Sequence, residues 1–277
     1  MEIKNHRLAD AEFKQTPNIG NPLVLPLPDT IVIHYTAGGS LQSSVATLCD
    51  PKSSASAHVV VGRDGKIVQL ADFNVVTWHA GKSTMQDNNG KIRNGVNQYS
   101  IGIEIDNAGL LTKKEDGSFV SWFGKVYNSD EVVQGIHRNE SVARYWHAYT
   151  EKQIETVNSI CQALIAFYPI KYIAGHEEIS PGRKTDPGPA FPLSKLRDRL
   201  LKAERKLDEP AQNNLPMRGI VQATSLNIRT RPELNADLKA KPLTQGTPVK
   251  ILEEKDGWYR VEVVVEGWTS AKFIVKS

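Results

Sequence analysis

Hydrophobic and polar positions are arranged in two stretches of the chain in ways that predict buried strands. Residues 30–35 read Thr-Ile-Val-Ile-His-Tyr, and such a near-continuous apolar run of β-branched residues is typical of a strand buried on both faces. Residues 100–106 alternate strictly, with three isoleucines on one face and Gly102 and Glu104 on the other. We therefore expect two strands, with a carboxylate in the middle of the second.

Helical periodicity is clearest in two later segments. Residues 150–153 form a capping box, and an apolar stripe at helical spacing follows them up to Pro169. A second, strongly charged amphipathic helix is expected at 193–207. The other elements expected in this part of the chain are a short helix at 40–48, a hairpin at 57–70 and a strand at 170–174. Together they indicate an α/β domain with a mixed central sheet flanked by helices.

Three segments lack a periodic pattern, and we interpret them as loops. Residues 21–29 contain three prolines and are expected to form an extended arm, and residues 87–97 are expected to form a polar loop. Residues 107–148 are long and irregular, and a connection of that length is usually functional or an insertion. We expect this insertion to be a lid or wall beside a site, and we assign no ligand role to its histidines His137 and His147.

The character of the chain changes near residue 208. Residues 208–218 contain two Pro and two Asn and are expected to be a linker between a first domain, 1–207, and a second, 219–277. The second domain has no helical period. It contains four short β-type runs, at 225–232, 247–252, 257–263 and 266–270. Runs with this spacing predict a small all-β barrel.

Composition narrows the class of protein without identifying a partner. The chain has 277 residues, of which 40% are hydrophobic and 23% are charged, which is ordinary for a globular protein and excludes disordered and collagen-like classes. A net charge of +3 does not argue for a nucleic-acid partner. We expect no membrane span. Cys49 and Cys161 lie in apolar contexts and are interpreted as buried thiols.

The N-terminal residues bear on where the protein acts. Residues 1–16 are polar and charged and contain no apolar core of a signal peptide. A cytoplasmic protein, one released by lysis, one exported by an unusual route and one whose signal was removed are all compatible with this start.

Residues 175–188 concentrate the candidate chemistry. They contain His176, Lys184 and Asp186 among turn-forming Pro and Gly residues, directly after a predicted strand, in a segment that we expect no helix or strand to span. A charged surface loop is the alternative. His176-Glu177 begins like the zinc motif H-E-x-x-H, but Ser180 replaces the second histidine, so any partner of His176 must come from elsewhere.

His34 and Glu104 are the candidate partners. His34 lies at the C-terminal end of its strand, where open α/β sheets place their sites, although a lone histidine there is more often structural. Glu104 is either catalytic or a solvent-facing residue of an edge strand. Two imidazoles and one carboxylate would leave a tetrahedral Zn²⁺ one open position, which is the arrangement of a catalytic zinc site. Lys184 and Asp186 are two positions apart, so an extended backbone points both the same way.

At these residues the chain resembles the type-2 N-acetylmuramoyl-L-alanine amidases, a zinc family that includes bacterial muropeptide amidases and peptidoglycan recognition proteins. The resemblance covers roughly residues 25–205. The matching motifs, in family order, lie at 33–37, 56–59, 78–81, 100–104 and 175–188. It implies one Zn²⁺ per chain held by His34, His176 and Asp186, with Glu104 as the general base and Lys184 steadying the tetrahedral intermediate.

The same resemblance assigns further residues. It implies that His58 is structural and that Trp78, His79 and Arg183 contact glycan or peptide in a groove. The C-terminal motifs Leu226-Asn227-Ile228-Arg229, Gly257-Trp258-Tyr259 and Gly267-Trp268 resemble a bacterial SH3-like domain, a module that often tethers wall hydrolases to peptidoglycan. The insertion at 107–148 and this extra domain distinguish the chain from the small cytosolic recycling amidases.

The implied reaction is hydrolysis of the amide between N-acetylmuramic acid and the L-alanine of the stem peptide. Two alternatives remain: a receptor that binds peptidoglycan without cleaving it, and an amidase of soluble muropeptides in cell-wall recycling. The expected partner is therefore peptidoglycan or a muropeptide, and the expected location is the cell envelope or outside the cell, with the cytoplasm as the alternative. The stem-peptide preference and the oligomeric state stay open.

Overall fold

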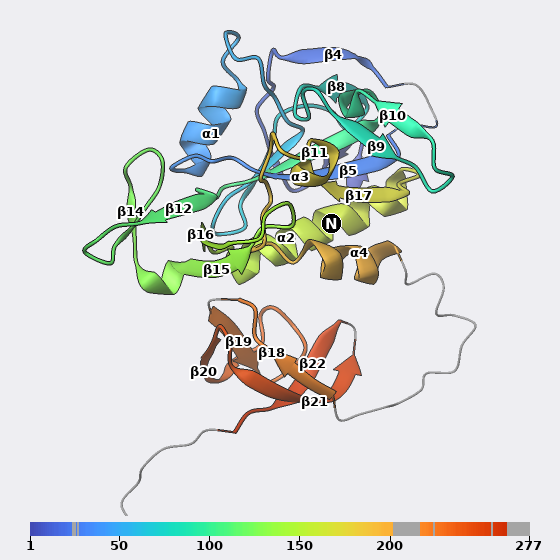
Figure 1. The fold of residues 1–277 in the computed structure, drawn as a ribbon. Coiled ribbons are helices and arrows are strands. Elements are labelled where there is room, and N and C mark those ends of the chain that lie inside the picture. Colours follow the sequence, from blue (N-terminus) through green and yellow to red (C-terminus); the bar gives the residue numbers. More distant parts are fainter. Residues whose placement is uncertain (24–25, 27, 202–216, 224, 256, 265–277) are drawn as a thin grey trace, which may run out of the picture. The chain divides into compact units, whose positions relative to one another are not determined.

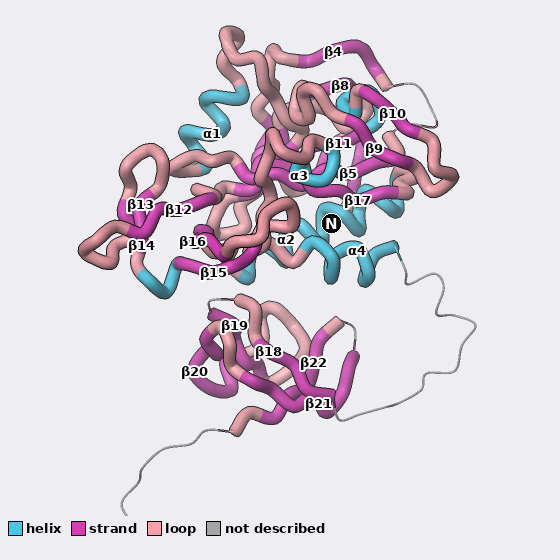
Figure 2. Tube along the Cα trace, viewed as in Figure 1, coloured by secondary structure: helices cyan, strands magenta, loops and turns pink. Residues whose placement is uncertain are grey.

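The computed structural model describes the chain except for residues 24–25, 27, 202–216, 224, 256 and 265–277 (Figures 1 and 2). Contacts between residues divide the chain into two compact units. The first is Met1–Glu209 with Ala223–Ser225, and the second is Pro210–Gln222 with Leu226–Ser277.

A mixed six-stranded sheet forms the centre of the first unit, in the order β17-β5-β11-β6-β7-β3. These strands are β17 Tyr172–Gly175, β5 Thr30–Tyr35, β11 Ser100–Ile105, β6 Val59–Val61, β7 Ile67–Gln69 and β3 Glu12–Phe13. β5 pairs in parallel with both β17 and β11, and β11 pairs in parallel with β6, whereas β6 and β7 form an antiparallel hairpin. The predicted strands, the hairpin and the mixed sheet are confirmed.

The two faces of β5 and β11 have different roles. Their isoleucines are fully buried in a core that includes side chains of α2, Glu151–Phe167, and α4, Leu193–Leu201, and both helices lie on the same side of the sheet (Figure 1). Each fully buried isoleucine stabilises the fold by about 1.5–3 kcal/mol. The opposite face carries His34, Gly102 and Glu104, because successive strand residues point to opposite faces. The apolar layer therefore fixes the sheet on which the polar face is built.

The helices predicted at 40–48 and after residue 150 both begin at residues whose side chains cap them. The Ser40 hydroxyl accepts a hydrogen bond from Ser43 N at 3.2 Å, and α1 follows as Leu41–Leu48. The predicted capping box of α2 is present, because Thr150 Oγ1 accepts from Gln153 N and Gln153 Oε1 accepts from Thr150 N. The second part of the helix predicted at 193–207 lies outside the described residues from 202 onward.

The cysteines are not paired with each other. Cys161 on α2 is buried, as predicted, whereas Cys49 after α1 is only partly buried.

The prediction of a polar loop at 87–97 is wrong in part. Strands β9, Thr84–Gln86, and β10, Ile92–Asn94, form an antiparallel hairpin, and a 3-10 turn follows at Val96–Tyr99. The Asp87 carboxylate accepts hydrogen bonds from Asn89 N and Lys91 N, both at 2.9 Å, and so closes the turn. Side chains on this hairpin are largely exposed, so no apolar alternation marked it in the sequence.

The prediction that residues 107–148 are irregular is also wrong. They form a five-stranded antiparallel sheet in the order β14-β13-β12-β16-β15. Its strands are β12 Leu110–Lys113, β13 Phe119–Val120, β14 Val126–Tyr127, β15 Val132–Ile136 and β16 Ala143–His147, with a 3-10 turn at Ser129–Glu131. Strands of two to five residues are too short for a period of two to be recognised against turn residues.

A third difference lies directly after β17. His176–Ile179 forms the single-turn helix α3, where we expected no helix. Ser180 ends the turn, and Pro181 follows it, a residue that cannot continue a helix.

Short strands complete the first unit. They are β1 Ile3–Lys4 and β2 Arg7–Leu8, which pair with each other, and β4 Ile19–Pro22 and β8 Val75–Thr77, which also pair. The last two residues of β4 are the first two of the extended arm predicted at 21–29.

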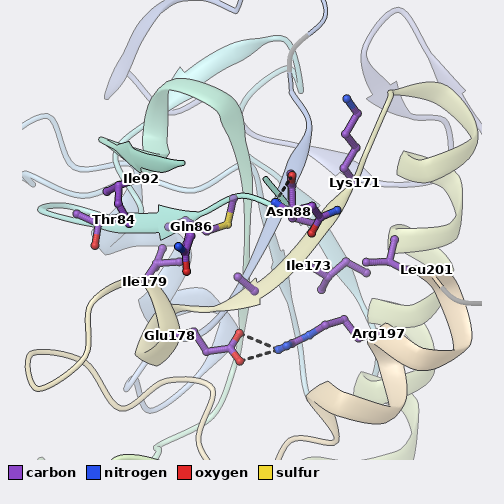
Figure 3. A pocket seen from close by; sticks show the side chains of 13 residues that line it. Thr84, Gln86, Asn88, Ile92, Lys171, Ile173, Glu178, Ile179, Arg197 and Leu201 are labelled. Carbon is purple, nitrogen blue, oxygen red and sulfur yellow. Dashed lines mark hydrogen bonds and ion pairs between the residues drawn. The ribbon is translucent and has the colours of Figure 1, made fainter. Parts of the chain in front are cut away.

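A cavity of about 530 Å³ lies beside β17, between that strand, the β9–β10 hairpin and α4 (Figure 3). Glu178 and Arg197 form an ion pair in its wall, with Nη2 to Oε2 at 2.7 Å. None of the candidate site residues lines this cavity.

All the described elements of the second unit are strands. β18 Met217–Ile220, β21 Pro248–Lys255 and β22 Trp258–Glu262 form a three-stranded sheet, and β19 Ser225–Arg229 pairs with β20 Leu238–Thr244. The predicted run at 266–270 and residues 208–216 of the predicted linker lie outside the described residues. Among the residues that the structure describes, no helix has the length and apolar character needed to cross a membrane.

Candidate metal centre

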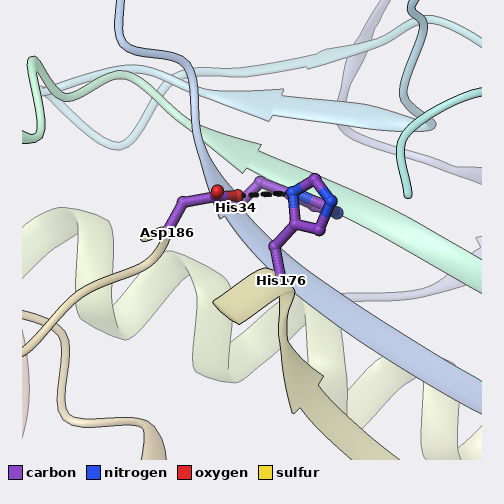
Figure 4. A group of neighbouring side chains, drawn as sticks. All are labelled: His34, His176 and Asp186. Atoms are coloured by element: carbon purple, nitrogen blue, oxygen red, sulfur yellow. Dashed lines mark hydrogen bonds and ion pairs between the residues drawn. The ribbon is translucent and has the colours of Figure 1, made fainter. Parts of the chain in front are cut away.

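Three buried side chains meet where two neighbouring parallel strands end (Figure 4). Ile33 of β5 pairs with Gly175 of β17, so the next residue of each, His34 and His176, come side by side. Asp186 reaches the same point from the loop after α3. His34 Nδ1, His176 Nδ1 and Asp186 Oδ2 lie 2.9 Å from one another. These three residues could hold a metal ion.

The protonation of the cluster suits a cation. His176 Nε2 lies 3.2 Å from the carbonyl oxygen of Ala80, which can only accept, and 3.4 Å from Arg183 Nη2, which can only donate; the nearer contact favours a proton on Nε2 and a bare Nδ1. Burial lowers the pKa of His34 to about 4, and His176 adds to this effect. Burial alone would raise the pKa of Asp186, but the neighbouring rings of His176 and His34 hold it well below its usual value. At pH 7 the cluster therefore combines neutral His34 with a carboxylate.

The spacing also suits a metal. Two atoms that each lie about 2.0–2.1 Å from one zinc ion can be no more than about 4.2 Å apart. The 2.9 Å separations meet this limit. Imidazole nitrogen and carboxylate oxygen are common zinc donors, and three such donors around one ion leave room for a fourth ligand.

Glu104 lies on the strand next to His34. In the parallel pairing of β11 with β5, Glu104 is opposite His34, and among the described side chains Glu104 Oε2 is a buried atom without a hydrogen-bond partner. Burial and the nearby Asp186 raise the pKa of Glu104, and Lys184 opposes them, with a net value of about 8. β11 is an interior strand between β5 and β6, so the alternative of an edge-strand glutamate is wrong.

Lys184 is partly buried in the loop after α3, and its charge acts on both Glu104 and His34. The structure therefore gathers all five residues that the sequence assigned to metal and catalysis around one end of the sheet.

The three residues predicted to contact substrate are placed differently from one another. Trp78 is 39% exposed, whereas His79 is only 6% exposed and lies behind His34, with both ring nitrogens hydrogen-bonded. Arg183 Nη2 donates to the carbonyl oxygens of Ala80 and Lys82 at 2.9 and 3.0 Å. His79 is therefore not on a groove surface, and Arg183 ties two loops together.

His58 is held as a structural residue would be. Its Nδ1 accepts from Gly102 N at 3.0 Å, and its Nε2 donates to Val75 O at 2.9 Å. The ring thereby connects β11 to β8 through the start of β6.

The insertion at 107–148 supports the segment that carries His176 and Asp186, a role that no sequence pattern indicated. His137 Nε2 lies 2.7 Å from the Glu177 carboxylate, and Asn139 Nδ2 donates to Glu177 O at 3.2 Å. Glu177 in turn is next to His176, and its N–H donates to Asp186 O at 2.8 Å. Residues of the insertion therefore fix the backbone that carries two of the three cluster residues.

A second contact of the insertion is with the loop that follows His34. Trp122 Nε1 donates to the carbonyl oxygen of Ala37 at 2.8 Å, three residues after His34, although the Trp122 side chain is 77% exposed. Ala37 has φ = 50°, a left-handed conformation that is uncommon for alanine. The insertion thus contacts both the loop that follows His34 and the segment that follows His176.

Comparisons with known proteins point to one family. Residues 25–189 match the family model Amidase_2, described as N-acetylmuramoyl-L-alanine amidase. Among curated proteins, the 1,6-anhydro-N-acetylmuramyl-L-alanine amidase AmpD of Escherichia coli K12 is 33% identical over 144 residues, which are 51% of this chain and 56% of that protein. The N-acetylmuramoyl-L-alanine amidase AmiD of the same strain is 32% identical over 180 residues, 62% of this chain and 52% of that protein.

The chain spans about half the length of these curated relatives. Among solved structures, a selenomethionine derivative of AmpD is 28% identical, with 71% of this chain and 98% of that chain covered and a TM-score of 0.49.

Proposed function

Because this chain belongs to the N-acetylmuramoyl-L-alanine amidase family, which its residues 25–189 match, we propose that it is a zinc-dependent hydrolase of the amide between N-acetylmuramic acid and L-alanine. The observation that carries this proposal is the group His34, His176 and Asp186, whose donor atoms lie 2.9 Å apart beside Glu104. Water adds to the carbonyl carbon, the C–N bond breaks, and the products are a lactyl carboxylate and the free amine of L-alanine.

His34 Nδ1, His176 Nδ1 and Asp186 Oδ2 would hold the zinc ion. When bound, zinc supplies Lewis acidity that polarises a carbonyl and lowers the pKa of water from about 15.7 to about 7. Two imidazoles with one carboxylate are the ligand set of catalytic zinc sites, which keep one position open.

Glu104 is the proposed general base. It accepts a proton from the attacking water and then gives that proton to the leaving nitrogen of L-alanine. Burial raises the pKa of Glu104 in the metal-free site and a bound cation would lower it again; a carboxyl group whose pKa lies near neutral pH can both accept and release a proton there. Its unpartnered Oε2 is available for the attacking water.

Lys184 is proposed to stabilise the negative charge that develops on the carbonyl oxygen. The support for this role is its charge, which acts on both Glu104 and His34. A fixed cation in a site of low dielectric stabilises such an oxyanion without reorganising.

The relatives favour soluble fragments over intact wall as substrate. The names of the AmpD relatives specify a 1,6-anhydro-N-acetylmuramyl group, which is the alternative that the sequence left open. We therefore propose 1,6-anhydromuropeptides as the substrate class, with polymeric peptidoglycan as the second candidate.

For the second unit we propose an SH3-like module that binds peptidoglycan. The support is its motif Leu226-Asn227-Ile228-Arg229 and the all-strand character of the described part. If the enzyme acts on soluble fragments, this unit binds wall polymer near the place where the fragments are released.

The direct test is product analysis with the full chain. The metal-loaded protein should release a stem peptide with a free L-alanine N-terminus from an anhydromuropeptide, as identified by mass spectrometry. Exhaustive chelation should abolish this release and lower the melting temperature, since a ligand at 100 times its dissociation constant stabilises a fold by about 2.7 kcal/mol; added Zn²⁺ should restore both.

Two outcomes would contradict the proposal. Full activity after verified metal removal would exclude the zinc mechanism. A zinc-loaded chain that binds muropeptides and sacculi tightly but releases no peptide would be a receptor.

A further inference from the structure

His79 occupies a buried position between a metal-ligand candidate and a strand. Its Nδ1 lies 2.9 Å from His34 Nε2, and its Nε2 lies 3.0 Å from Ser100 Oγ. The His34 and His79 rings meet edge to face, with centroids 5.1 Å apart and planes at 80°. His34 therefore touches His79 through the nitrogen opposite the one that faces Asp186.

Ser100 fixes the direction of this chain of hydrogen bonds. Its hydroxyl donates to Val96 O at 2.6 Å, and because a hydroxyl has one proton, Ser100 Oγ can only accept from His79. His79 Nε2 is therefore the donor. A neutral imidazole carries one proton, so a ring that donates through Nε2 has none on Nδ1.

The same reasoning assigns the proton of the His34 ring. With its proton on Nε2, His79 presents a bare Nδ1, which can only accept, so His34 Nε2 must donate to it. Neutral His34 then has no proton on Nδ1, the atom that lies 2.9 Å from both Asp186 Oδ2 and His176 Nδ1. If the hydrogen bonds ran in the opposite direction, Ser100 Oγ–H would have to donate to both His79 Nε2 and Val96 O, but the hydroxyl has only one proton.

The backbone of β11 is shaped to hold His79. A Cβ built on Gly102 would lie 2.4 Å from His79 Cγ and 2.8 Å from its Cβ, closer than atoms approach, so the missing side chain of Gly102 is the space that the imidazole fills. The hydrogen bond from Gly102 N to His58 keeps this stretch of strand in place. Gly102 therefore makes room for His79.

We infer that His79 is a positioning residue which, through the relay His34–His79–Ser100–Val96, holds His34 in the Nε2–H tautomer and aims its bare Nδ1 at the metal position. The inference rests on the metal site of the proposed function. A ligand histidine whose other N–H is bound keeps its tautomer and ring orientation, and loss of such a partner typically weakens metal affinity about 10- to 100-fold.

The first test observes the tautomer directly. In the full-length, metal-free protein at pH 8, long-range ¹⁵N–¹H correlation spectra should show His34 and His79 each protonated at Nε2 and bare at Nδ1. A His34 ring protonated at Nδ1 in the wild type would overturn the inference. This measurement needs neither metal nor activity.

The second test measures Zn²⁺ affinity by chelator competition. His79→Phe keeps the ring volume but removes the acceptor, and should bind Zn²⁺ about 10- to 100-fold more weakly. His79→Asn places a carbonyl oxygen near the Nδ1 position and should recover most of that loss. Ser100→Ala, which leaves the His79 ring in place, should weaken affinity in the same direction but less.

The matched control is His147→Phe. His147 is also buried, at 5% exposure, and its Nδ1 also accepts a backbone N–H, from Ala108, but it does not touch the cluster. The His147→Phe variant should retain wild-type Zn²⁺ affinity. The melting temperatures of the metal-free variants should show any general loss of stability.

The outcomes separate this inference from the proposed function. Equal affinity in His79→Phe and wild type, or equal weakening in His79→Phe and His79→Asn, would overturn the positioning role. A wild-type chain that binds no Zn²⁺ would contradict the proposed function, while the spectra would still decide the proton assignment.

Discussion

The two carboxyl groups of the site have pKa values that are shifted in opposite directions. The neighbouring rings of His176 and His34 hold the pKa of Asp186 well below its usual value, whereas burial raises the pKa of Glu104 to about 8. A pair of carboxyl groups whose environments separate their pKa values in this way indicates distinct roles, one permanently charged and one able to exchange a proton. This matches Asp186 as ligand and Glu104 as base.

Replacement of Glu104 tests that division. Glu104→Gln keeps the shape of the side chain but cannot accept a proton, so turnover should fall about 10²- to 10⁴-fold, which corresponds to about 3–5 kcal/mol of barrier, while zinc content stays near wild type. Asp186→Ala should lose the metal, and Lys184→Ala should keep it with lower turnover. Turnover of Glu104→Gln at the wild-type rate would assign the base role elsewhere.

His58 gives a prediction about acid stability. Burial lowers its pKa to about 4 from an ordinary value near 6.5, so between these values the unfolded chain binds the proton and the folded chain does not. Its contribution is therefore present above pH 6.5 and is lost as the pH falls towards 4, by roughly 3 kcal/mol at about 1.36 kcal/mol per pKa unit. Urea unfolding of the metal-free protein should show this fall.

The variant His58→Asn isolates the effect. Asparagine can still accept from Gly102 N but does not titrate, so the stability difference between wild type and variant should narrow as the pH falls from 7 to 5. A difference that stays constant over this range would show that His58 is not responsible.

Single residues of the site could be assigned from the sequence where the backbone around them is regular. His34 and Glu104 lie on strands whose apolar pattern is unambiguous, so both their face and their end of the sheet followed. The burial of His79 did not follow. It depends on how residues 78–81 fold over Gly102, a contact between segments 21 or more residues apart that no local pattern records.

Among the elements, the insertion sheet, which was expected to be a lid or wall, supports the loop that carries His176 and Asp186. The side chains of His137 and Asn139 bind Glu177, and the Gly188 N–H donates to the same carboxylate at 3.1 Å. Trp146 of β16 fills the space over Gly188, where an added Cβ would lie 3.0 Å from its ring. The loop that carries His176 and Asp186 is thereby packed against β15 and β16.

Removal of the contact between His137 and Glu177 should destabilise the loop that carries His176 and Asp186. His137→Ala leaves the buried Glu177 carboxylate without its side-chain partner, and an unsatisfied buried polar group typically costs about 1–3 kcal/mol of unfolding free energy. Zinc should also dissociate faster from this variant. Urea unfolding and chelator-induced zinc release are the two measurements.

Arg144→Ala provides the control within the same insertion. Arg144 pairs with Glu140 at 2.8 Å but is 49% exposed, and exposed pairs contribute about 0–1 kcal/mol. If His137→Ala is no less stable and no quicker to lose zinc than Arg144→Ala, the insertion does not support the metal loop.

Whether an element could be predicted from the sequence depended on its length and on whether one of its faces is buried. β5, β11 and α2 have 6, 6 and 17 residues and a buried face, so their periodicity is visible. The insertion strands have two to five residues, and α3 has a single turn whose backbone is fixed by contacts with Asp186 and the insertion. Tertiary contacts, which the local sequence does not contain, decide such short elements.

Across the whole molecule, the division into two units predicts that catalysis and polymer binding can be separated. A chain ending near residue 207 keeps the whole metal site, so it should hydrolyse small anhydromuropeptides at the rate of the full chain. It should bind and degrade intact sacculi less well, because the second unit no longer raises the effective concentration at the polymer. Unchanged binding and degradation of sacculi by the shortened chain would refute the proposed module.

The parallel pairing of β11, β5 and β17 has a consequence for the covalent continuity of the chain. The proposed base and two of the three proposed ligands are placed by register across three adjacent strands, with Glu104 opposite His34 and Gly175 opposite Ile33, and not by the length of chain that joins them. The exposed turn at residues 114–117, between β12 and β13, could therefore be cut by a protease without separating the reacting groups. The two fragments would be expected to remain associated as a non-covalent heterodimer, with the proton acceptor on one polypeptide and two of the three metal ligands on the other.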